Sequence, residues 1–89
     1  MAQLFVHHQV KDYPKWRQVY DEMDGVRRSL GMTGARVFHT AANPNEIVII
    51  TDWPTADNAR AYAQSPDLKQ AMQNAGVLSQ PEVLILEEV

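Results

Sequence analysis

Histidines are the residues of this 89-residue sequence best suited to proton chemistry near neutral pH. His7 and His8 are adjacent, and His39 lies in a second apolar stretch. An imidazole gains or loses a proton close to neutrality, so it could move the proton in an enolisation or a cyclisation. His8 and His39 are therefore candidate catalytic residues. The alternatives are structural: a buried, hydrogen-bonded His8 with no chemical task, and a surface His39.

Three further side chains are candidates for ligand binding. Trp53 could form a flat apolar wall for an aromatic ligand, or simply pack in the core. Tyr62 could donate a hydrogen bond to a ligand carbonyl, or pack on its neighbours with its hydroxyl in water. His7 is the third, because adjacent residues of a strand leave opposite faces. One of His7 and His8 should therefore enter the interior between two sheets, and parity alone does not tell which.

Metal chemistry is not expected from these residues. Adjacent His7 and His8 cannot chelate one ion, and three histidines without a carboxylate at ligand spacing do not form a metal motif. The sequence has no cysteine, which removes disulfides, thiolate nucleophiles and sulfur ligands. It also has no Gly-rich stretch in a strand–turn–helix context that would bind phosphates. We expect neither a metal nor another cofactor.

The apolar patterns that must position these residues predict a ferredoxin-like βαββαβ chain of the α+β class. They fit four strands, at 4–10, 35–42, 46–53 and 82–89, and one domain over residues 1–89. Asn43-Pro44-Asn45 predicts a tight hairpin between the second and third strands. Residues 77–80 are expected to form a connecting loop. The right-handed rule for crossovers places all helical segments on one face of an antiparallel sheet.

Two helical regions separate the strands. The first follows Asp12, a potential N-cap, and ends before Gly31, with a bend expected at Gly25. The second begins at Thr55, breaks at Ser65-Pro66 and ends at Gly76. One stripe of the first region has a spacing of three and four residues. Its members are Trp16, Val19, Tyr20, Met23, Val26, Arg27 and Leu30.

The strands are apolar on both faces, although helices can cover only one. Residues 47–50 and 83–86 are uninterrupted runs of Ile, Val and Leu. Leaving one face in water forfeits about 1.5–3 kcal/mol for each large side chain. A small chain without disulfides has little stability to lose. We therefore expect a two-fold homodimer in which the bare faces meet, the alternative being a monomer with an exposed apolar face.

Composition limits the other partners. The formal net charge is −3 and the eight Lys and Arg residues are scattered, which argues against a nucleic-acid partner. No segment is apolar enough to span a bilayer and no leader is evident, so we expect a cytoplasmic protein without a membrane partner. An RNA-binding domain of the same topology would need a basic surface and exposed strand aromatics, and it is the least favoured alternative.

Short motifs across the chain resemble the dimeric α/β-barrel superfamily. The resemblance rests on Asp52-Trp53 at a strand end, on Thr55 at the start of a helix, and on Ser65-Pro66-Asp67-Leu68. The nearest branch in these motifs is the antibiotic-biosynthesis-monooxygenase-like proteins. The resemblance implies a homodimer with facing sheets and a pocket either between each sheet and its helices or inside the barrel. Members include cofactor-free oxygenases, haem-degrading enzymes, polyketide cyclases and proteins without an assigned activity.

The sequence departs from that pattern at positions that matter for chemistry. The helix His of the monooxygenase-like branch falls at Tyr62, and no residue near Tyr62 matches the haem-ligating His of the haem-degrading branch. Haem degradation is therefore disfavoured. Polar residues at this point of the first strand in the resembling proteins favour His8 as the pocket acid/base. The function implied is a small-molecule-binding homodimer, acting as a cofactor-independent monooxygenase or cyclase on an aromatic, polyketide-like substrate. The alternative is a non-catalytic ligand-binding or stress-associated dimer.

Overall fold

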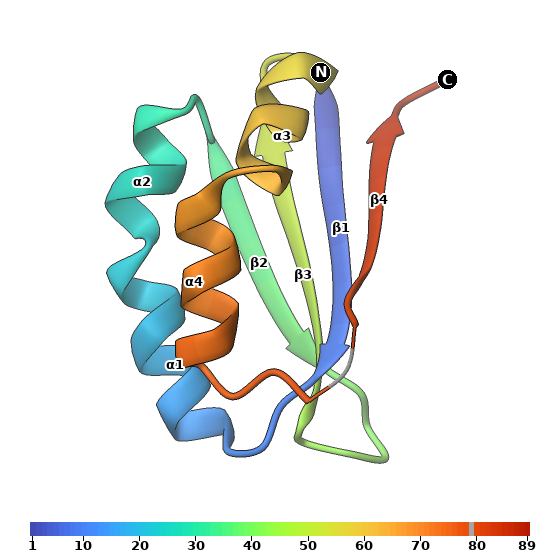
Figure 1. Cartoon of the computed structure of the whole chain (residues 1–89). Coiled ribbons are helices and arrows are strands. Elements are labelled where there is room, and N and C mark those ends of the chain that lie inside the picture. The colour runs from blue at the N-terminus through green and yellow to red at the C-terminus, as the bar shows by residue number, and fades with distance from the viewer. Residues whose placement is uncertain (79) are drawn as a thin grey trace.

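A computed structural model describes residues 1–78 and 80–89 and gives eight elements (Figure 1). In chain order they are β1 (Ala2–Gln9), α1 (Tyr13–Glu22), α2 (Asp24–Ser29), β2 (Gly34–His39), β3 (Glu46–Trp53), α3 (Ala56–Ala63), α4 (Pro66–Asn74) and β4 (Glu82–Glu87). The strands form one sheet in the order β2-β3-β1-β4, with every neighbouring pair antiparallel. This is the expected ferredoxin-like βαββαβ arrangement.

Element boundaries differ from expectation where local hydrogen bonding decides them. The second strand ends at His39 rather than at residue 42, because the N–H of Thr40 makes the last ladder-like bond, to the carbonyl of Glu46. The hairpin turn closes as expected, with Glu46 N–H donating to Asn43 O at 3.1 Å. The first helical region breaks at Met23 rather than at Gly25. The expected loop at 77–80 includes Ser79, which lies outside the described residues.

Caps fix where the later helices begin. The Thr55 side chain accepts a hydrogen bond from Asn58 N–H at 3.2 Å, and the Ser65 side chain accepts one from Asp67 N–H at 3.1 Å. These two bonds confirm the predicted starts of α3 and α4. Asp12 precedes α1 but makes no side-chain cap bond, so that part of the prediction is wrong. Gly31 closes α2 at φ +111°, a conformation that glycine adopts without strain.

The helices cover one face of the sheet and bury its side chains. Figure 1 shows the helices on the same side of the sheet and the two termini at the same end. Ile47, Ile49, Leu4 and Val6 are buried beneath them. None of the described residues covers the opposite face, where Leu84 and Leu86 remain 48% and 39% exposed. We call this second surface the open face.

Trp53 anchors the core at the end of β3. It is fully buried, and its indole N–H donates to Thr51 Oγ1 at 2.8 Å. Its ring also stacks on Tyr62 of α3, with the ring centroids 5.3 Å apart. A buried indole N–H needs such a partner because an unsatisfied donor is costly. Thr51 therefore fixes the rotamer of Trp53, and through the stacking of Trp53 on Tyr62 it also helps to position α3 on the sheet.

Replacing Thr51 with valine keeps the shape of this side chain but removes the acceptor. We expect Thr51→Val to lower the free energy of unfolding by about 1–3 kcal/mol, since the indole N–H stays buried without a partner. Urea denaturation measures the change. Thr33→Val is the matched control, because Thr33 is exposed and its hydroxyl makes only a long 3.4 Å bond. Equal stability of the two variants would contradict the role given to Thr51.

Candidate functional site

An apolar pocket lies between the sheet and its own helices. Its volume is about 50 Å³. The sheet contributes its buried face, including Leu4, Val6 and Ile49. The helical layer contributes flexible side chains, including Met72 of α4 and Met23 at the junction of α1 and α2. A cavity of this size exceeds the roughly 10–15 Å³ that one water needs. The site is therefore preformed, and its shape is set by side chains from both layers.

Several residues that line the pocket have buried polar atoms without a hydrogen-bond partner in the described part of the chain. Among the described residues, four buried side-chain atoms make no hydrogen bond: Nδ1 and Nε2 of His8, the hydroxyl of Tyr20 and Nε of Arg27. All three residues line this one pocket. Buried polar groups are normally satisfied, so a cluster of exceptions needs a cause. A polar ligand or ordered water in the pocket would supply the missing partners.

His8 lies on β1 facing the helices and is 3% exposed. Its ring meets the Trp16 ring edge-on, with the centroids 5.8 Å apart. Burial, with a smaller contribution from the neighbouring His7, lowers the pKa of His8 to about 4. The imidazole is therefore neutral at neutral pH, with one nitrogen able to accept a proton and the other able to donate one. The neutral ring can therefore both accept and donate a hydrogen bond inside the apolar pocket.

Arg27 of α2 brings a positive charge to the same pocket although it is only 2% exposed. Its Nη2 donates to the carbonyl of Tyr20 at 2.6 Å, and its guanidinium carbon lies 3.8 Å from the centre of the Tyr20 ring. Asp24 approaches no closer than 4.0 Å and lies nearer to Arg28, at 2.8 Å. The charge of Arg27 is thus oriented by hydrogen bonding and stacking, but poorly neutralised.

Two tyrosines accompany Arg27 at the pocket wall. Burial raises the pKa of Tyr20 and of Tyr62. Arg27 partly opposes both shifts, by its charge at Tyr20 and by hydrogen bonding as well as charge at Tyr62. Both phenols are therefore neutral at neutral pH, and each can donate a hydrogen bond. Tyr62, proposed from the sequence as a ligand-binding residue, lines the pocket. Trp53 does not line it, but supports Tyr62 from behind by ring stacking.

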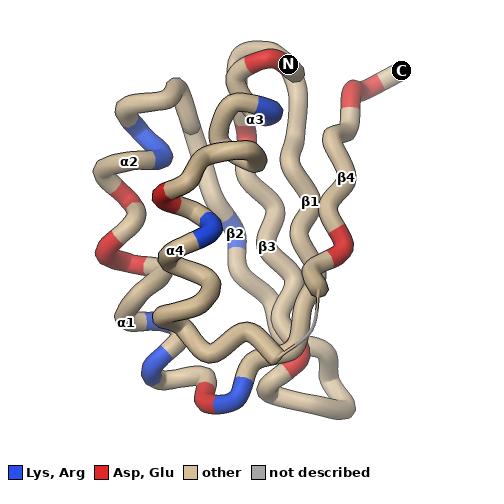
Figure 2. Tube along the Cα trace, viewed as in Figure 1, with Lys and Arg blue, Asp and Glu red and all other residues tan. Residues whose placement is uncertain are grey.

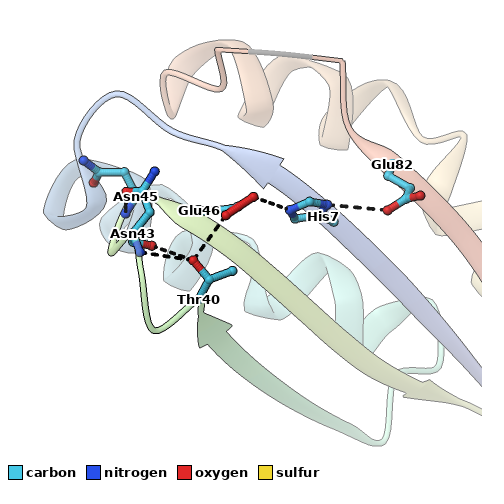
Figure 3. Close-up of polar contacts among 6 residues, drawn as sticks. All are labelled: His7, Thr40, Asn43, Asn45, Glu46 and Glu82. Atoms are coloured by element: carbon cyan, nitrogen blue, oxygen red, sulfur yellow. Dashed lines mark hydrogen bonds and ion pairs between the residues drawn. The ribbon is translucent and has the colours of Figure 1, made fainter.

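His7 points to the open face, opposite to His8 (Figure 3). Its Nε2 lies 3.0 Å from Glu46 and its Nδ1 lies 3.5 Å from Glu82. Glu46 in turn accepts a hydrogen bond from the Thr40 hydroxyl at 3.2 Å. The register answers the question that sequence parity left open: it is His7, and not His8, that faces the side where a second sheet could pack. Ligand binding by His7 would therefore take place outside the helix-side pocket.

His39 lies at the end of β2 on the surface. The residue is exposed, and its Nδ1 is 2.8 Å from the carbonyl oxygen of Thr40. It is not among the residues that line the helix-side pocket. The structure therefore brings His8 and Tyr62 together and leaves His39 apart from them. A proton carried by His39 could not reach a ligand enclosed in this pocket without a rearrangement.

Sequence reasoning did not identify Arg27 and Tyr20 as site residues. Arg27 was placed on the stripe of the first helical region but was given no part in a site, because charged residues usually lie at the surface. The available signal was its position on the apolar stripe, seven residues after Tyr20 and four after Met23. An arginine on the buried side of a short helix indicates a polar site beneath it.

Charges elsewhere on the molecule are mixed in sign. Figure 2 shows Lys and Arg spread along the helices and loops and interspersed with Asp and Glu, which argues against a nucleic-acid surface. In the part of the chain that the structure describes, no three His, Cys, Asp or Glu residues are placed to hold a metal ion. Over the same residues, no helix has both the length and the apolar character needed to cross a membrane.

The fold and the helix-side pocket define a class, the ferredoxin-like α+β proteins with a cavity between sheet and helices. A family model described as antibiotic biosynthesis monooxygenase matches residues 11–74, most of the chain. The chain therefore belongs to the antibiotic biosynthesis monooxygenase family. No curated protein matches it in sequence.

Solved structures share the whole fold at low sequence identity. A candidate antibiotic biosynthesis monooxygenase from Bordetella bronchiseptica superposes with a TM-score of 0.80 at 17% identity, covering 99% of this chain and 96% of its own. A second, from Nitrosomonas europaea, gives 0.76 at 14% identity and covers 100% and 99%. SnoaB, a cofactor-independent oxygenase from Streptomyces nogalater studied as a mutant, gives 0.75 at 19% identity and covers 98% and 91%. These likenesses establish the fold.

The low pKa of His8 predicts a pH dependence of stability. An unfolded histidine has a pKa near 6.5, so between about pH 6.5 and 4 the unfolded chain binds a proton at His8 that the folded chain does not. Stability is therefore complete above that window and is lost as the pH falls through it, by about 3 kcal/mol in all. Denaturant unfolding of wild type at pH 7 and pH 4.5 measures the loss.

His8→Leu should remove most of this dependence because it eliminates the titrating group. His39→Leu is the control, since His39 is exposed and should leave the pH dependence unchanged. A His8→Leu protein that loses as much stability as wild type between the two pH values would rule out a buried neutral His8.

Proposed function

We propose that this protein binds a small apolar, aromatic molecule in the helix-side pocket and acts on it as a cofactor-independent monooxygenase or cyclase. The observation that carries the proposal is the convergence of the unpartnered atoms of His8, Tyr20 and Arg27 on one apolar cavity. Membership in the monooxygenase family and the fold shared with SnoaB, described as a cofactor-independent oxygenase, are consistent with it. An apolar pocket with a few convergent polar groups is the usual form of a small-molecule site.

The chemistry would begin with a proton. Neutral His8 takes a proton from a CH₂ group next to a carbonyl of the substrate, leaving an enolate. In a monooxygenase the enolate reacts with O₂ to give a peroxide, which loses water to leave a second carbonyl. One CH₂ group and one O₂ become one C=O group and one water, so no external reductant is consumed. In a cyclase the same enolate attacks a carbonyl of its own chain.

The pocket must open to admit such a substrate. Its volume of about 50 Å³ is well below the roughly 150 Å³ of a cavity that binds benzene. Leu68 and Met72 line it from α4 and Met23 lines it from the junction of α1 and α2, and unbranched methionines change shape readily. Movement of these side chains and of the helices that carry them would enlarge the cavity without disturbing the sheet. Small ring systems are thus favoured over large ones.

We propose that two copies of the chain form a homodimer through their open faces. It exposes Phe38, Leu84 and Leu86, whose exposed fractions lie between 39% and 48%, beside half-buried Phe5 and Ile50. An exposed apolar patch on one face of a sheet is typical of an interface. Two such faces related by a two-fold axis would enclose the His7 cluster between the sheets.

Mass measurement in solution tests the dimer. The expected mass is twice the 10.1 kDa of one chain. Leu84→Lys should weaken the dimer about 100-fold or more, because each of two leucines loses roughly 1.5–3 kcal/mol of burial and a charge is buried instead. Light scattering across a dilution series gives the dissociation constant. Leu78→Lys is the control, since Leu78 is a 63% exposed leucine outside the sheet. A monomeric wild-type protein would contradict the proposal.

Oxygen uptake tests the catalysis. With enolisable aromatic ketones of two fused rings, wild type should consume O₂, and His8→Ala should lower kcat about 100-fold or more because the proton acceptor is lost. His39→Ala should keep wild-type kcat, since its side chain lies outside the pocket. An oxygen electrode and product mass measure both quantities. A His8→Ala enzyme with unchanged turnover would exclude His8 as the base.

A non-catalytic binding protein is the second candidate. It is favoured by one observation: no side chain among the described residues hydrogen-bonds to the His8 ring, whereas catalytic histidines usually have such a partner. Wild type can be tested with a range of ketones. If it binds them but neither takes up O₂ nor forms a cyclised product, the result would support a non-catalytic binding protein. A stress-associated role belongs to this alternative.

A further inference from the structure

Arg27 carries a charge that the described part of the protein leaves largely unbalanced. The residue is 2% exposed, and the single carboxylate within ion-pair distance of it, Asp24, lies at 4.0 Å. Asp24 is itself half exposed and bound more closely to Arg28. A buried cation without a close anion is strongly unfavourable. Its retention is explained if a ligand brings the missing negative charge.

We propose that the helix-side pocket selects ligands that carry an anionic oxygen, a carboxylate or an enolate, which binds the free Nε–H of Arg27. The inference deepens the proposed small-molecule site and rests on it. Nη2 of Arg27 is already used by the carbonyl of Tyr20, and this bond holds the guanidinium in place. Nε is buried and has no partner among the described residues, and Arg27 lines the pocket. An arginine fixed by one bond with another donor free is preorganised for an oxyanion.

Neutral donors surround this position. Tyr20 and Tyr62 line the same wall as Arg27, and the hydroxyl of Tyr20 is buried without a partner. A carboxylate has about four acceptor sites, so it can accept from the guanidinium and from a phenol together. A neutral alcohol could satisfy one donor but not the charge. The site therefore distinguishes acids from their neutral analogues.

The contacts along the wall indicate the shape of the ligand. The His8 ring meets Trp16, Trp16 stacks on Tyr20 at 5.0 Å between centroids, and Tyr20 lies under Arg27. Two stacked aromatic rings thus lie between the proton acceptor and the cation. A flat apolar body against these rings would place its acidic oxygen at Arg27 and its other end toward His8. The class of ligand is an aromatic acid or a readily formed aromatic enolate.

Paired probes test the acid requirement. 2-Naphthoate and 2-naphthalenemethanol share one ring system and differ in the anionic group. We expect wild type to bind the acid about tenfold or more tightly than the alcohol at pH 7, as measured by calorimetry and by naphthalene fluorescence. Arg27→Met should abolish this preference by weakening binding of the acid, while its affinity for the alcohol is unchanged. Circular dichroism checks that the variant folds.

Two further variants complete the design. Arg60→Met removes an exposed charge of α3 that pairs with Asp57, and it should leave both affinities unchanged. Asp24→Asn removes the anion that competes for Arg27 and should tighten binding of the acid about two- to threefold. Asp24→Asn and the wild-type comparison remain decisive if Arg27→Met does not fold.

The outcomes separate this inference from the proposed function. Equal affinity of wild type for acid and alcohol, or an acid preference that survives in Arg27→Met, would overturn acid selection and leave the pocket in place. Failure of wild type to bind either probe would overturn the proposed pocket and this inference with it. A preference lost equally in Arg60→Met would show that general surface charge, and not Arg27, is responsible.

Discussion

The two faces of the sheet meet different environments, and the rest of the structure follows from that difference. The helices α1 to α4 cover one face of the four-stranded sheet. Alternation along β1 then sends His8 under the helices and His7 to the open face. The covered face becomes the core and contains the pocket. The open face keeps leucines in contact with solvent and a charged cluster around His7.

The core on the covered face of the sheet contains buried polar groups that lower the stability of the fold. A core made only for stability would not enclose an imidazole with two free nitrogens, a free phenol and a poorly paired guanidinium. Each of these groups is expensive to bury unless something else binds it. They lie along a single aromatic wall formed by Trp16 and Tyr20, and not scattered through the core. That arrangement is the physical reason for regarding the cavity as a ligand site.

Much of the fold could be predicted because it depends on patterns that are local in sequence. Alternating and continuous apolar runs located the strands, and Thr55 and Ser65 located two helix starts through their caps. The break at Met23 was not predicted, because the low helix propensity of Gly25 indicated a bend two residues further along the chain. Asp12 shows the same limit, since a residue suited to capping made no cap bond.

The site was harder to predict than the fold. His8 and Tyr62 were identified from their residue types, and both line the pocket. His39 was an equally good candidate by type, but its exposure depends on where β2 ends and on its edge position in the sheet. Arg27 was overlooked because charge normally indicates the surface. Its burial depends on how α2 is set against Tyr20, a three-dimensional contact that the position of Arg27 on the apolar stripe indicates only in part.

His7 and His8 offer a direct way to decide which face binds the ligand, because they are neighbours in sequence that report on opposite faces. The measurement is a long-range ¹H–¹⁵N NMR spectrum of the imidazole nitrogens, recorded at pH 7 while 2-naphthoate is added. If the helix-side pocket binds the ligand, the signals of both ring nitrogens of His8 shift on saturation while those of His7 and His39 stay in place. Shifts at His7 with an unchanged His8 would mean that the ligand lies on the open face, and would contradict the assignment of the helix-side pocket.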